Sequence, residues 1–270
     1  MTQRIERPWT GYPATYAAQD YRQLVGRSVA VRQLEEDIHC ATRTDVNVLI
    51  TGESGVGKEF IARLIHEKSS RAKGPFVVVN CVGANGSTPD TEWNGWAGIA
   101  WDHETAKATV EGPRVGTIFL KEAGELVSRM QVAVLHFLET RILEGDVQRG
   151  VNRIDLRPIA ATTRNLRADV EAKIFSEDLF YRLNTIHLIV PPLRDRPEDI
   201  SALVLHYLHA GTPQRMQVPD ISAGALRQLM DYTWPGNVRE LRRVVDALIR
   251  RAGSDVVTAA DLPVNIGELS

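Results

Sequence analysis

The sequence predicts an α/β fold, in which helices cover a mainly parallel five-stranded sheet and a small helical domain follows. Short apolar, β-branched runs alternate with helical segments, a pattern typical of parallel sheets. A glycine-rich turn joins the first of these runs to the helix after it. Beyond residue 198 every periodic segment is helical. With 270 residues, the chain is long enough for one large domain and a small companion.

The elements of the α/β part follow in order. Residues 1–20 show little periodicity, and we expect an irregular arm there. Ser28 is a good N-cap for the first helix. A later helix should carry Met130, Val134, Leu138 and Ile142 on one stripe. The five expected strands are Val46–Thr51, Pro75–Asn80, Gly116–Leu120, Leu156–Thr163 and Ile186–Val190.

A proline-rich stretch, Pro191–Ile200, ends the alternation and marks the domain boundary. The helices expected after it are Glu198–Leu208, Ser222–Tyr232 and Asn237–Arg251. We therefore divide the chain into an arm (1–20), an α/β domain (21–192) and a helical domain (193–265).

Composition excludes several classes of protein. The formal net charge is −2, so the chain as a whole has no strong attraction for nucleic acid or anionic membranes. No apolar run approaches the about 20 residues that span a bilayer, and no signal peptide opens the sequence. Cys40 and Cys81 have no metal-ligand spacing, and the histidines form no HExxH motif. We expect a cytoplasmic protein without a membrane segment or a metal site of its own.

The glycine-rich turn matches the phosphate-binding pattern GxxxxGK between a strand and a helix. Its glycines let backbone N–H groups turn toward a phosphate, the helix N-terminus adds positive potential, and the lysine supplies a cation. The alternative is a structural turn, which the position at a strand-to-helix junction disfavours. The predicted nucleotide-binding residues are Gly52, Glu53, Ser54, Gly55, Val56, Gly57, Lys58 and Glu59.

Eight blocks in order make the chain resemble the central AAA+ domain of bacterial sigma-54-dependent transcription activators, the enhancer-binding proteins. They are Leu24–Ser28, Leu49–Glu59, Gly74–Cys81, Gly116–Leu126, Ile159–Leu166, Glu177–Asn184, Pro191–Ile200 and Trp234–Leu241. The resemblance implies a P-loop AAA+ three-layer αβα sandwich with a helical lid, ATP or ADP as ligand, ring assembly and a link to the transcription machinery.

The resemblance also assigns individual roles. It implies that Glu122 polarises the attacking water and that Asn80 is a switch residue holding that glutamate. Arg182 would act in trans as a finger on a neighbour's ATP, and Arg239 would sense nucleotide from the lid. Surface ion pairing is the alternative role for both arginines.

Three departures from the family pattern bear on ATP hydrolysis. Lys121 stands where the family has the aspartate that holds Mg²⁺, so we expect Mg²⁺ binding to be weakened. Thr163 replaces the sensor asparagine, and Ser176 replaces the first of two arginine fingers. An ATPase built on this chain is therefore expected to be impaired.

The sigma-54 contact loop also departs from the family. The interval Thr91–Gly112 lacks the GAFTGA motif and contains Trp93, Trp96 and Trp101, which suits a packed or partner-facing insertion. No DNA-binding domain is expected, and conventional sigma-54 contact is the reading that the sequence supports least. Three functions stay open: an ATP-binding regulator with weak or absent hydrolysis in a homo-oligomer or mixed AAA+ ring, a working ATPase that remodels a transcription complex, and a nucleotide-independent scaffold.

Overall fold

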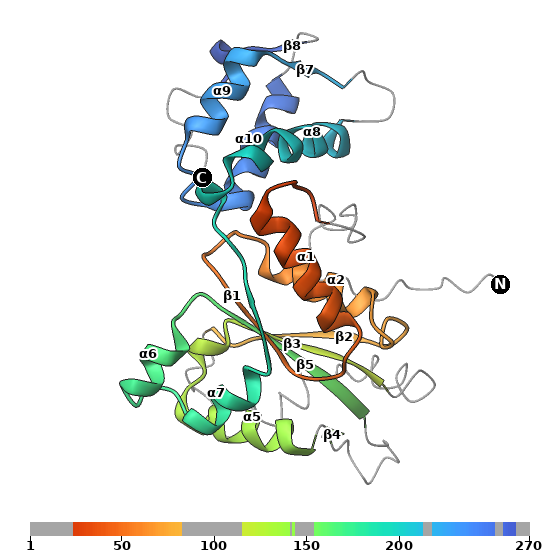
Figure 1. Ribbon diagram of the computed structural model, residues 1–270, viewed down its shortest axis with the longest axis vertical. Coiled ribbons are helices and arrows are strands. Elements are labelled where there is room, and N and C mark those ends of the chain that lie inside the picture. The colour runs from red at the N-terminus through yellow and green to blue at the C-terminus, as the bar shows by residue number, and fades with distance from the viewer. Residues whose placement is uncertain are drawn as a thin grey trace, which may run out of the picture.

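The computed structural model describes residues 24–82, 115–140, 142–143, 154–212, 218–251 and 256–262. The helical domain lies above the α/β sandwich in Figure 1, and an extended segment joins the two. The expected arm at 1–20 and the tryptophan-rich interval Thr91–Gly112 lie outside the described residues. Within the described part, no helix is both long and apolar enough to cross a membrane.

The five predicted strands form one parallel sheet in the order β2-β3-β5-β1-β6. Their bounds are β1 Val48–Thr51, β2 Phe76–Asn80, β3 Val115–Lys121, β5 Ile154–Thr162 and β6 Ile186–Ile189. A two-residue strand, β4 (Ile142–Leu143), adds an antiparallel pair to β5 and was not predicted. The register sets Lys121 opposite both Asn80 and Ala161, so the carboxyl ends of β2, β3 and β5 meet at one edge.

Helices cover both faces of the sheet. One face packs on α1 (Val29–Thr42) and α2 (Lys58–Glu67), and the other packs on α5 (Ser128–Thr140), α6 (Leu166–Glu171) and α7 (Glu177–Leu183). The central strands are buried on both faces, which explains their nearly continuous apolar runs. As predicted, Ser28 caps α1, and its side chain accepts a hydrogen bond from the Val31 amide.

One predicted helical position is wrong. Met130, Val134 and Leu138 lie on the buried stripe of α5, but the helix ends at Thr140 and Ile142 belongs to β4. Ile142 instead pairs with Asp155 of β5 in the antiparallel ladder. An apolar residue four positions after Leu138 suits both a continued helix stripe and a short strand. The spacing of apolar residues alone therefore could not show that Ile142 lies outside the helix.

The helical domain is built from α8 (Ile200–Gly211), α9 (Ala223–Asp231) and α10 (Asn237–Arg251) around the buried Trp234. The sequence predicted an entirely helical domain, but the domain also contains a short pair of strands. Two-residue strands β7 (Asp220–Ile221) and β8 (Val256–Val257) pair in parallel and bring the segments before α9 and after α10 together. Strands this short show no periodicity in a sequence.

A buried carboxylate joins the two parts of the molecule. Asp199, just before α8, is fully buried and accepts hydrogen bonds from the amides of Arg27 (2.5 Å) and Ser28 (2.8 Å). It also accepts one from the Ser28 hydroxyl at 2.6 Å, and Gly26 leaves no room there for a side chain. The N-terminus of α1 is thus fixed by the helical domain.

Candidate functional site

The glycine-rich loop follows β1 directly and ends in α2, as the sequence predicted. Gly55 and Gly57 adopt φ values of +80° and +106°, which side-chain-bearing residues rarely adopt. A Cβ on Gly55 would lie 2.2 Å from the Gly236 carbonyl oxygen, because the loop packs against the turn that leads into α10. These glycines shape the loop and also let the helical domain approach it.

Lys58 begins α2 and is only 8% exposed. Its ammonium donates to the carbonyls of Gly52 (2.8 Å) and Glu53 (3.1 Å) and lies 3.5 Å from the Glu122 carboxylate. Burial lowers the pKa of the lysine, whereas Glu122 acts in the opposite direction. The cation is therefore held in the loop beside the first turn of α2, where backbone N–H groups have no acceptor within the helix.

Glu122 lies at the end of β3 in a left-handed conformation with φ of 55°. One of its carboxylate oxygens faces Lys58. The other accepts hydrogen bonds from the amide (2.8 Å) and hydroxyl (3.1 Å) of Thr163, which follows β5. Thr163, the replacement for the family's sensor asparagine, thus fixes the glutamate that was expected to polarise water.

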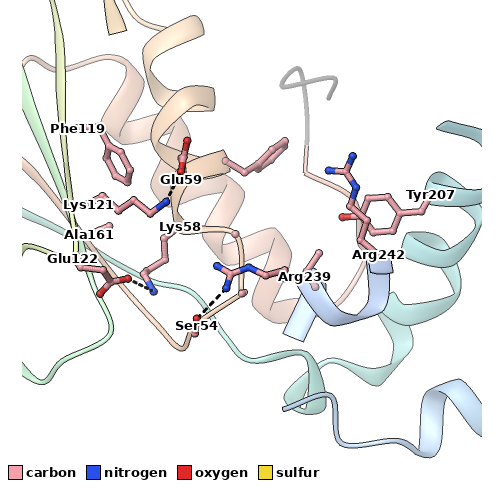
Figure 2. A pocket seen from close by; sticks show the side chains of 14 residues that line it. Ser54, Lys58, Glu59, Phe119, Lys121, Glu122, Ala161, Tyr207, Arg239 and Arg242 are labelled. Atoms are coloured by element: carbon pink, nitrogen blue, oxygen red, sulfur yellow. Dashed lines mark hydrogen bonds and ion pairs between the residues drawn. The ribbon is translucent and has the colours of Figure 1, made fainter. Parts of the chain in front are cut away.

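Lys121 also points into this region, and it pairs with the residue that follows Lys58. Its ammonium lies 3.2 Å from a carboxylate oxygen of Glu59 (Figure 2). The other oxygen of Glu59 accepts a hydrogen bond from Arg63 at 3.1 Å. Two lysine–glutamate pairs therefore cross between β3 and α2. The pairing of Lys121 with Glu59 was not foreseen in the sequence, because 62 residues separate the two.

A cavity opens between the loop and the helical domain. Of the predicted binding residues it is lined by Ser54, Gly55, Gly57, Lys58, Glu59 and Arg239, together with the predicted catalytic Glu122. Val56 is buried in the core instead, and the Gly52 carbonyl accepts from Lys58. The lining side chains include four cations and two carboxylates: Lys58, Lys121, Arg239 and Arg242 against Glu59 and Glu122. This excess of positive charge suits an anionic ligand.

The helical domain supplies lining residues that the sequence analysis missed. Across the cavity from the two lysines, Arg242 extends over the Tyr207 ring, with its guanidinium carbon 5.9 Å from the ring centre. Arg239 lies one turn earlier on α10 and donates to the Ser54 hydroxyl at 3.4 Å. The i, i+3 spacing of the two arginines was the available signal, because it sets both on one helix face.

Glu53 faces the helical domain rather than the cavity. Arg194 donates two hydrogen bonds of 2.6 and 2.8 Å to the Glu53 carboxylate, and the side-chain amide of Asn237 donates a third of 3.2 Å. These hydrogen bonds lower the pKa of Glu53 to about 2, and Arg194 contributes more to the lowering than Asn237 does. Asn237 also donates to the Ser54 carbonyl, so the loop is latched to the start of α10.

The remaining predicted residues lie outside the cavity lining. The side-chain Oδ1 of Asn80 accepts a hydrogen bond from the Val82 amide at 3.2 Å, and Asn80 is not among the residues that line the cavity. Arg182 on α7 is half exposed and lies 3.3 Å from Glu139 of α5. Ser176 caps α7 by accepting from the Leu179 amide, a structural use of the position where the family has an arginine.

The donor set fits Mg²⁺ poorly. P-loop sites hold the ion partly through a nearby acid, and here Lys121 stands at that position. Both lining carboxylates already contact cations. A divalent ion close to the Lys121 ammonium would also be repelled by it. Among the described residues, no cluster of three or more acidic, histidine or cysteine side chains is arranged to hold a metal.

Comparison with known proteins agrees with this architecture. The family model of the sigma-54 interaction domain matches residues 24–189, and that of the AAA+ ATPase lid domain matches residues 194–270. The chain belongs to the sigma-54 interaction domain family. The fold class, an AAA+ α/β domain with a lid, is confirmed as well.

Relatives of this sigma-54 interaction domain are transcription regulators. It is 39% identical to regulatory protein AtoC of Escherichia coli (strain K12) over 90% of this chain and 53% of that protein. It is 36% identical to the DNA-binding transcriptional regulator NtrC of Rhizobium meliloti (strain 1021), covering 89% and 50% of the two chains. The chain thus spans about half the length of these curated relatives.

A solved structure gives the same view of the fold. The structure of NtrX from Brucella abortus in complex with ATP superposes with a TM-score of 0.74 at 34% identity, covering 93% of this chain and 59% of that one. The NtrX complex with ADP gives 0.75 at 32% identity, covering 94% and 58%.

Proposed function

We propose that this sigma-54 interaction domain binds ATP or ADP in the cavity and hydrolyses ATP weakly or not at all. It would regulate transcription through protein contacts or ring assembly. The observation that carries the proposal is the intact loop with Lys58 held over the first turn of α2, set opposite an acidic motif in which Lys121 replaces the metal-binding acid. The first feature favours phosphate binding, and the second opposes metal-assisted phosphoryl transfer.

Nucleotide binding is supported by charge and by likeness. The cavity lining carries two more positive than negative side chains, and the NtrX relative was crystallised with ATP and with ADP. In this proposal Lys58 and the amides of the loop bind the phosphates, and Arg239 contacts the same ligand from the helical domain. The adjoining Tyr207 and Arg242 close the far side of the cavity.

Impaired hydrolysis is supported by the state of Glu122. One oxygen of this carboxylate accepts both hydrogen bonds from Thr163 and the other lies 3.5 Å from Lys58, so a water that uses Glu122 as its general base must compete with Thr163 and Lys58. Lys121 adds a second ammonium beside the same cavity, and we expect it to weaken Mg²⁺ binding. The proposed roles of Asn80 as a switch and Arg182 as a finger in trans would then depend on conformations or neighbours beyond this single chain.

Action through an assembly is the remaining part of the proposal. Arg182 is exposed on α7 and lies outside the lining of its own cavity, which is what a residue directed at a neighbour requires. In a mixed ring the chain would contribute this arginine to a competent relative while its own site turns over slowly. A finger of this kind is worth 10³–10⁵ in rate to the site that receives it.

Calorimetric titration of the purified chain with ADP tests the binding part. We expect Lys58→Ala to weaken ADP by roughly a hundredfold, since a charge-assisted hydrogen bond contributes up to about 3 kcal/mol. Lys68→Ala, at the exposed other end of α2, is the matched control and should leave the affinity unchanged. Equal affinity of the native chain and Lys58→Ala, or no binding by either, would contradict the proposal and favour a nucleotide-independent scaffold.

A further inference from the structure

We propose that Lys121 is a built-in cation that lets the cavity bind nucleoside diphosphates and triphosphates as metal-free anions. The inference rests on the proposed nucleotide binding and names the form in which the nucleotide is bound. It rests on the position of Lys121, on the partners of the nearby carboxylates and on the charge that is left over.

The position of Lys121 is set by the sheet. It is the last residue of β3, opposite Asn80 of β2 and Ala161 of β5, and its side chain lines the cavity beside Lys58. Figure 2 shows both lysines on the sheet side of the cavity, with Arg242 on the side of the helical domain; the ammonium groups of Lys121 and Lys58 are directed at Glu59 and Glu122. A phosphate chain lying along the glycine-rich loop would therefore pass between cations from both sides.

The Lys121 charge is in excess of what Glu59 needs. Glu59 already has Arg63 as an i, i+4 partner on α2 at 3.1 Å, so the group of Lys121, Arg63 and Glu59 carries a net charge of +1. Lys121 is also 40% exposed, and its four-carbon stem can turn from Glu59 toward a ligand in the cavity. An extra, movable cation beside Lys58 supplies the charge that a metal ion supplies in other P-loop sites.

The two carboxylates that line the cavity, Glu59 and Glu122, are not free to act as metal ligands. Glu59 would have to release two cations, and Glu122 would have to release Lys58 and the two donors of Thr163. The same residues that disfavour Mg²⁺ thus favour a polyanion without it. A site that prefers the metal-free nucleotide and a site that needs Mg²⁺ change their measured affinity in opposite directions when Mg²⁺ is added. Binding measurements alone can therefore test the inference.

The experiment is calorimetric titration with ADP, in excess EDTA and in excess MgCl₂, of the native chain and of Lys121→Asp, Lys121→Met and the surface control Lys68→Met. With MgCl₂ at about ten times the Mg²⁺–ADP dissociation constant, the native chain should bind ADP about tenfold more weakly than in EDTA, because Mg²⁺ competes for the free nucleotide. Lys121→Asp should bind at least about tenfold more weakly in EDTA and recover in MgCl₂, because it exchanges the ammonium for a potential metal ligand. Lys121→Met should lose affinity in both solutions, and Lys68→Met should behave as the native chain.

A second readout follows the metal directly. Electron paramagnetic resonance of Mn²⁺ with ADP should show that ADP bound to the native chain holds the ion more weakly than free ADP does, whereas ADP bound to Lys121→Asp should retain it. Native binding that is as tight in MgCl₂ as in EDTA, or tighter, would overturn the inference while leaving nucleotide binding intact, and so would Lys121→Met that binds as the native chain in EDTA. Failure of the native chain to bind in either solution would instead remove the proposed function, and this inference with it.

Discussion

The two ends of the parallel sheet both gather charged side chains, but they use them differently. At the amino end, Arg71 is 4% exposed and binds Asp45, Asp155 and the carbonyls of Gly116 and Asp155. At the carboxyl end, Lys121 and Glu122 line an open cavity. The first cluster is closed by backbone acceptors on two strands, whereas the second keeps cations that a ligand can take over. Access to an open cavity, more than the residue types, separates the structural cluster from the binding one.

The largest expected effect comes from reversing the departures at the carboxyl end. Lys121→Asp combined with Thr163→Asn should raise ATP hydrolysis in Mg²⁺ by roughly a hundredfold, because it supplies a metal ligand and removes the hydroxyl hydrogen bond of Thr163 to Glu122. Phosphate release is the measurement. The same pair of substitutions with Glu122→Gln added should return to the native rate. An unchanged rate in the double variant would mean that the impairment lies elsewhere, for example at Ser176.

The amino end should respond in stability and not in binding. Arg71→Met removes a buried cation and leaves two aspartates and two carbonyls without it, so we expect a loss of about 2 kcal/mol in the free energy of unfolding. Arg164→Met is the matched control: it breaks a two-bond pair with Asp169 at the surface and should cost less than about 1 kcal/mol. Urea denaturation compares them. Weakened ADP binding by Arg71→Met would break the contrast between the two ends.

The smallest effect concerns the latch between Glu53 and Arg194. Both side chains are over 40% exposed, so Glu53→Gln should lower stability by no more than about 1 kcal/mol at neutral pH. The folded-state pKa of Glu53 is depressed to about 2 from 4.5. Its contribution is therefore present above about pH 4.5 and is lost as the pH falls toward 2.

The measurement for the latch is the difference in melting temperature between the native chain and Glu53→Gln across this range. For Arg194→Gln this difference should change less strongly with pH, because Asn237 still donates to the Glu53 carboxylate. A difference that stayed constant as the pH fell from 4.5 toward 2 would show that Glu53 acts by packing and not by charge.

Local patterns made much of this structure predictable. The glycines of the loop, the Ser28 cap and the five apolar strands are each encoded within a few neighbouring residues, and the structure has them where they were expected. Helix α5 and strand β4 were harder, because Ile142 continues an apolar period across the end of the helix.

Contacts between distant residues were beyond reach. Asn237 lies 184 residues from Glu53, and Arg194 lies 141 residues from it, so the latch exists only once the helical domain has folded against the loop. The sequence pointed to Lys121 as a departure, but the partner that holds it, Glu59, depends on how β3 lies beside α2. Pairwise geometry of this kind requires the fold.

The central claim is that this site holds nucleotide without serving as a motor. Phosphate release from ATP by the purified native chain, measured alongside ATP binding with and without Mg²⁺, tests it most directly. The account predicts binding in both solutions and little or no release in either. Steady, Mg²⁺-dependent release at a rate typical of a working ATPase would contradict it and would show that another carboxylate does the work of the acid that Lys121 replaces.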